Sequence, residues 1–207
     1  MSRPARIPRP PGVANRLVRY ILGFGVGVSV GLAPYLGVYK IPLFHSMLTL
    51  IPSTLREPLL PLSAALMGLL AVAVQWYEGE NVSPIKLKKL FKRTLVFAFS
   101  TLLLLFVIHR FVVLQVPTFG GNSVAILKGF VRPDKQPCGP DISDLECIRR
   151  VTLDEAKINS FWGDGQVRTA GITLSLLYLL FTGAFGTLVG LIILRELVVK
   201  RRASSEP

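Results

Sequence analysis

The chain has 207 residues and a formal net charge of +12; 51% of its residues are hydrophobic and only 17% are charged. Its mean hydropathy is +0.52, whereas about a quarter of the residues in a soluble domain are charged. This composition excludes an ordinary soluble domain. The basic residues have no aromatic residues beside them on a folded module, so we expect no nucleic-acid partner.

The apolar residues gather in four blocks, each long enough for a helix to cross a hydrocarbon core of roughly 30 Å. In lipid, a helix satisfies its own backbone donors and acceptors. The sequence therefore predicts an all-α integral membrane protein with four transmembrane helices, at Leu17–Val38, Pro58–Tyr77, Thr94–Val116 and Ala170–Leu194.

The segments around these helices define the expected domain organisation. Residues 1–15 are basic and rich in proline, and we predict a disordered cytoplasmic tail there. Residues 16–117 hold the first three helices with short loops. The first apolar run is too long for a secretory signal core and lacks an A-x-A-like cleavage site, which indicates an uncleaved signal anchor. Residues 118–169 form an extracytoplasmic lobe, and residues 170–207 form the fourth helix and a basic cytoplasmic tail.

Glycines recur every four residues in the first span, at Gly23, Gly27 and Gly31, and a shorter row in the last span holds Gly186 and Gly190. Membrane helices associate through close approach of their backbones, so such rows indicate packing faces. Two arrangements stay open. The first span packs on the last within one chain, which we favour slightly, or the rows pack between chains and give a homo-oligomer.

The basic residues lie on alternating connections. Cytoplasmic segments of membrane proteins are enriched in Lys and Arg, so both termini are expected in the cytoplasm, with the cytoplasmic segments attracted to anionic lipid. Residues 118–169 carry seven basic and seven acidic residues and are expected outside. The basic residues on the cytoplasmic side are Arg3, Arg6, Arg9, Arg16, Arg19, Lys86, Lys88, Lys89, Lys92, Arg93, Arg195, Lys200, Arg201 and Arg202.

His109 and Arg110 are the main candidates for a functional polar pair within the predicted spans. They lie roughly 20 Å along the third helix, in the outer part of the bilayer. Ionisable residues within a span are functional candidates. The structural alternative, which we favour, is that the helix leaves the membrane near Ile108 and continues into the lobe.

The lobe opens with an apolar segment bounded by glycines. Val124 and Ile126, together with Phe130 and Val131, predict a β-strand. Residues 134–147 are rich in turn-forming residues and predict a loop. The result is a small α+β lobe between the third and fourth spans.

A short helix is expected at the end of the lobe. Thr152 and Glu155 have the spacing of a capping box, and Gly163 ends the segment. Trp162 lies beside this glycine and is a candidate for the boundary between water and lipid.

Cys138 and Cys147 are the only cysteines, and both fall in the lobe. A cysteine pair outside the cytoplasm favours a disulfide. Two free thiols are the alternative. The spacing is not that of a zinc site and neither histidine lies near the pair, so no metal is expected.

No catalytic constellation and no cofactor motif is visible in the sequence. We therefore expect a non-enzymatic multi-pass membrane protein that anchors, binds or senses a partner through its lobe and its basic cytoplasmic segments. The first alternative is an oligomeric pore-forming or membrane-perturbing effector. The second is an integral-membrane enzyme or transporter.

Overall fold

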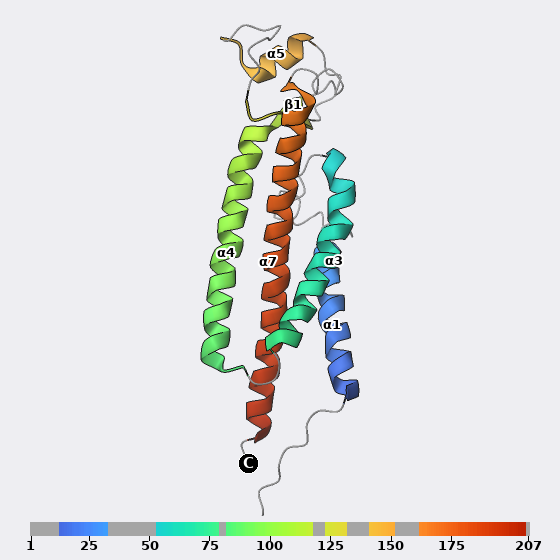
Figure 1. The fold of residues 1–207 in the computed structure, drawn as a ribbon, viewed down its shortest axis with the longest axis vertical. Coiled ribbons are helices and arrows are strands. Elements are labelled where there is room, and N and C mark those ends of the chain that lie inside the picture. Colours follow the sequence, from blue (N-terminus) through green and yellow to red (C-terminus); the bar gives the residue numbers. More distant parts are fainter. Residues whose placement is uncertain are drawn as a thin grey trace, which may run out of the picture.

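The computed structural model describes residues 13–32, 53–78, 82–117, 123–131, 141–151 and 162–205. Its elements, in chain order, are α1 (Val13–Leu32), α3 (Ser53–Glu78), α4 (Pro84–Val112), β1 (Val113–Pro117), β2 (Ser123–Leu127), α5 (Asp144–Val151) and α7 (Asp164–Ser205). The four longest helices lie along the long axis of the molecule, and β1 and α5 lie together at one end (Figure 1).

Three of the described helices are long and apolar enough to cross a membrane: Leu55–Trp76 in α3, all of α4, and Asp164–Val199 in α7. They correspond to the predicted second, third and fourth spans. The first predicted span differs, because the apolar part of α1 covers only Tyr20–Leu32 and residues 33–38 lie outside the described residues. Among the described residues, three helices could therefore cross a membrane, and the fourth span stays a prediction.

Helix α3 lies between α1 and α7, and α4 packs on the side of α7 (Figure 1). The sequence led us to expect the first span to pack on the last, but α1 packs chiefly on α3 and touches α7 much less. The helices therefore form a row in the order α1, α3, α7, α4. α4 stands at one edge of this row, and most of its side chains are exposed.

Small residues determine how closely α3 is held. A Cβ atom added at Gly27 of α1 would lie 2.8 Å from the Cα of Gly68, and one added at Gly186 of α7 would lie 2.7 Å from the Cα of Met67. At Met67 and Gly68 the backbone of α3 therefore lies close to a glycine of α1 on one side and a glycine of α7 on the other. Two further close approaches extend the same interfaces: Gly31 against Ala64, and Gly190 against Ala71.

Helix α4 begins and ends away from its predicted bounds. It starts at Pro84, ten residues before the expected Thr94, and the side chain of Ser83 caps it by accepting from the N–H of Lys86 at 3.3 Å. It ends at Val112, four residues before the expected Val116, because Val113 adopts extended backbone angles. Strand β1 follows with no connecting residue, so the last part of the predicted third span is a strand.

The lobe contains one antiparallel pair of strands. β1 pairs with β2 in a register that places Val113 opposite Leu127 and Val116 opposite Val124. The predicted strand at Val124 and Ile126 is confirmed as β2, but it ends at Leu127, before Phe130.

The segment predicted as a turn-rich loop, residues 134–147, contains the start of helix α5 instead. The hydroxyl of Ser143 accepts from the N–H of Glu146 at 3.3 Å, which satisfies one of the free donors at the helix start. The helix expected from Thr152 lies outside the described residues. So do residues 1–12 of the predicted tail at residues 1–15, whereas residues 13–15, expected to be disordered, form the start of α1.

Candidate functional site

The lobe has a small apolar core of its own. Its buried members come from the two strands, α5 and the start of α7, and are Val116, Ile126, Ile148, Trp162 and Val167. Leu127 packs both against this core and against the membrane-helix core that contains Val112 and Leu174. The lobe is therefore a direct continuation of the helix bundle.

Short contacts hold the segment that follows β2, residues 128–131, against the helices. The N–H of Lys128 donates to the carbonyl oxygen of Val112, with 2.7 Å between the two atoms. One residue later the chain passes close over α7, since a Cβ atom at Gly129 would lie 2.9 Å from the Cβ of Gln166. The N–H of Val131 then donates to Oε1 of Gln166 at 3.3 Å. This segment is thus tied to both α4 and α7.

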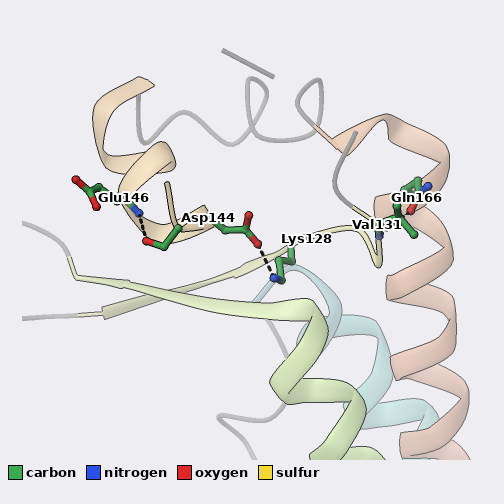
Figure 2. Close-up of polar contacts among 6 residues, drawn as sticks. Lys128, Val131, Asp144, Glu146 and Gln166 are labelled. Atoms are coloured by element: carbon green, nitrogen blue, oxygen red, sulfur yellow. Dashed lines mark hydrogen bonds and ion pairs between the residues drawn. The ribbon is translucent and has the colours of Figure 1, made fainter. Parts of the chain in front are cut away.

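An ion pair joins β2 to α5. The Nζ of Lys128 lies 2.7 Å from Oδ2 of Asp144, the first residue of α5, and both side chains are about four-fifths buried (Figure 2). A carboxylate at a helix N-terminus also interacts favourably with the helix dipole. The pair fixes α5 against the end of the sheet.

Two apolar side chains remain exposed on this segment. Phe130 is 44% exposed and Val131 is 61% exposed. Because the contacts around Gly129 hold the backbone, these side chains project from a fixed position beside the start of α7. An exposed apolar pair on a fixed scaffold is suited to contact with another molecule.

Trp162 lies in the lobe core and is only 3% exposed. The sequence placed it at the boundary between water and lipid, and that interpretation is wrong, because the strands and α5 cover the ring. Gly163 follows with a φ of 77°, a conformation that favours glycine. The chain uses this residue to turn into α7.

Cys147 is fully buried on α5, and no cysteine within the described residues is a free thiol. Cys138 lies outside the described residues, so its pairing with Cys147 stays a prediction.

His109 and Arg110 lie in the last turn of α4, directly before β1. The carbonyl oxygen of His109 accepts from the N–H of Val113, which closes the helix. Basic side chains at a helix C-terminus complement the helix dipole. This position gives the pair a structural role at the junction of helix and lobe, and a functional role stays a prediction.

Gln75 is a polar side chain that sequence reasoning missed. It is 6% exposed, near the end of α3, and in the described part of the chain neither its Oε1 nor its Nε2 has a hydrogen-bond partner. A Cβ atom at Gly23 would collide with its amide nitrogen. The first glycine of the row therefore makes room for an amide rather than for a helix backbone.

A groove of about 520 Å³ opens between α3 and α4, with α7 as its floor. Leu66 and Leu70 line it from α3, Phe97 from α4, and Leu180 from α7. Arg93 lines it from α4 and is its one charged residue. The sequence placed Arg93 only among the basic residues of a connection, because nothing in the spacing showed that α3 and α4 leave α7 uncovered between them.

In the described ranges, no group of three or more His, Cys, Asp or Glu side chains is placed to hold a metal ion. Comparison of the chain with known protein families, curated proteins and solved structures found no match.

Proposed function

We propose that the chain is a non-enzymatic membrane subunit whose helices hold the lobe at the outer membrane surface, where the lobe binds or senses a protein partner. The observation that carries this proposal is the construction of the lobe. β1 continues α4 without a connecting residue, and the lobe core includes Trp162, just before α7, and Val167, in its first turn. A lobe built in this way presents its surface in a fixed orientation.

The exposed pair Phe130 and Val131 supplies the binding surface in this proposal. The hydrogen bond from Val131 to Gln166 and the close approach at Gly129 hold it in place. A surface that is fixed before binding loses less conformational freedom when a partner binds.

The test uses the full chain, cross-linked in its native membrane and then purified in mild detergent. We expect a defined protein to be retained by the parent and lost in Val131→Asp, since a charge in an apolar contact is costly. Ile85→Asp is the matched control, because Ile85 is 82% exposed at the opposite end of the bundle. Equal retention by the parent and both variants would contradict the proposed surface.

A second measurement separates this function from a pore. Sealed liposomes that contain the purified chain should retain a small fluorescent dye, because an anchoring subunit needs no aqueous path. Release of the dye in proportion to the amount of protein would contradict the anchoring function and support the pore-forming alternative.

The topology forms part of the proposal. We place the termini in the cytoplasm, count α1 with residues 33–38 as a fourth span that acts as a signal anchor, and place residues 118–169 outside. The support is the charge distribution, with basic residues at the start of α4 and the end of α7. Reporter fusions after Glu80 and at Lys135 should be active on the cytoplasmic and outer side respectively. The reverse pattern would refute this arrangement.

We also propose a disulfide between Cys138 and Cys147. These are the only cysteines of the chain, and Cys147 is buried in the lobe. Such a bond would stabilise the lobe by roughly 2–3 kcal/mol. A thiol-alkylating reagent should label neither cysteine in the native protein until a reductant is added, whereas Cys147→Ser should leave Cys138 open to labelling. Labelling of both cysteines without reductant would contradict the bond.

A further inference from the structure

We propose that the groove between α3 and α4 is a binding site for one anionic phospholipid, with the phosphate at Arg93 and an acyl chain along the apolar walls. The site is independent of what the lobe binds. The proposal combines the size of the groove, its depth in the membrane and its charge.

The size of the groove fits a small ligand rather than a helix. Its volume of about 520 Å³ lies within the range of roughly 300–1,000 Å³ for small-molecule sites. A membrane helix that covered the groove would bring apolar side chains to Arg93 and leave the guanidinium without a counterion, which is costly. A second copy of the chain is therefore the poorer occupant. Half of the lining residues are leucine or phenylalanine, and Arg93 is the one charged residue among them, which suits an acyl chain.

The depth of the groove places Arg93 at the level of lipid headgroups. The apolar part of α4 that follows it, residues 95–112, has a length of about 27 Å at 1.5 Å per residue. This length matches a hydrocarbon core of roughly 30 Å. Arg93 then lies at the edge of this core, while Phe97 and Leu180 extend from the same groove into the hydrocarbon.

The charge at this end of the groove fits an anion. Arg93 forms no ion pair with any acidic residue in the described part of the chain, and residues 84–94 contain no acidic residue. The hydroxyls of Thr94 and Thr187, which also line the groove, donate to carbonyl oxygens of their own helices at 3.0 Å. The guanidinium of Arg93 is thus the group available to a phosphate, and guanidinium binds phosphate through two parallel hydrogen bonds.

The test measures lipid retention by native mass spectrometry. The full chain is equilibrated in detergent with equal amounts of phosphatidylglycerol and phosphatidylcholine that carry the same acyl chains. We expect one phosphatidylglycerol per chain, in preference to phosphatidylcholine. Arg93→Gln should lower this retention roughly tenfold, the scale of one charge-assisted hydrogen bond, and Arg93→Lys should keep part of it.

Two further variants locate the lipid. Lys88→Gln removes another exposed charge, on a different face of α4, and should leave retention unchanged. Leu180→Trp fills the groove from a half-exposed position and should lower the retention of both lipids. The thermal midpoint of each variant, measured in parallel, should equal that of the parent.

Several results would overturn the proposal. Equal losses in Arg93→Gln and Lys88→Gln would indicate diffuse attraction by the basic residues. Unchanged retention in Leu180→Trp would place the lipid elsewhere. Displacement of the lipid by inorganic phosphate would show that the site binds an anion without a chain. Dimeric ions that disappear in Leu180→Trp would identify a second copy of the chain as the occupant.

Discussion

Gly27→Ala and Gly186→Ala are each expected to lower the midpoint of thermal unfolding of the full chain in detergent. The added methyl group meets the backbone of α3 at 2.8 Å in the first variant and 2.7 Å in the second, and a backbone cannot rotate away as a side chain can. Overpacking of this kind typically costs about 1–3 kcal/mol. Membrane helices associate largely through close packing, so little else compensates for this loss of stability.

Gly25 provides the matched control, because a Cβ atom there would have nothing within 4 Å. Alanine is favoured over glycine in a helix by about 1 kcal/mol, so Gly25→Ala should keep or raise the midpoint. The double variant Gly27→Ala with Gly186→Ala should lose more than the sum of the single losses, since α3 is then pushed from both sides and cannot shift away from either. If the thermal midpoints of both single variants equalled that of the parent, the helices would have moved apart enough to accept the methyl group without loss of stability, and the prediction would be contradicted.

Trp162→Ala is expected to unfold the lobe while the membrane helices stay folded. The indole ring is 3% exposed and packs, among the described residues of the lobe, in a core with four other buried residues. Replacing a buried tryptophan by alanine costs about 3–5 kcal/mol, which is large for so small a core. Amide hydrogen exchange should become fast in β1, β2 and α5 and stay slow in the middle of α3 and α7.

The chain contains a second tryptophan that serves as the control. Trp76 is 72% exposed and stacks on Tyr20 with ring centroids 5.8 Å apart. Trp76→Ala removes the same side chain from a surface position and should leave exchange in the lobe at the parent rate. If Trp162→Ala also left the exchange in β1 and β2 slow, the lobe core would not depend on this ring.

The membrane helices could be predicted because their signal is a long apolar run, but their ends could not. The residues from Val112 to Val116 are apolar except for Gln115, and a short apolar run is compatible with both helix and strand. Nothing in the sequence marks the change at Val113, which depends on pairing with β2. The sequence did contain a signal for α5. Ser143 and Glu146 have capping-box spacing, which indicates a helix start. The prolines and the glycine before them favour a loop, and the prediction followed these residues instead.

The glycine rows were visible in the sequence, but their partner was not inferred. Ala64 and Gly68 stand four residues apart in the second span, and this pair of small residues faces Gly31 and Gly27 in the structure. Comparing small residues in all spans, rather than only the two glycine-rich ones, would have identified α3 as the central helix. The role of Arg93 in the groove could be recognised only from the fold, because the groove forms where three helices leave a gap.

The order of the helices in the row differs from their order in the chain, and this has a consequence for biosynthesis. α1 can pair with α3 as soon as both have been made, because α3 is the main neighbour of α1. α4 packs on α7 and continues into β1, so among the described helices its principal partner is the last to leave the ribosome. At about 5–20 residues per second, α4 stays without that partner for several seconds after its own insertion. During this interval lipid or a membrane chaperone has to cover the face that α7 later buries, which makes α4 the helix most exposed to errors of assembly.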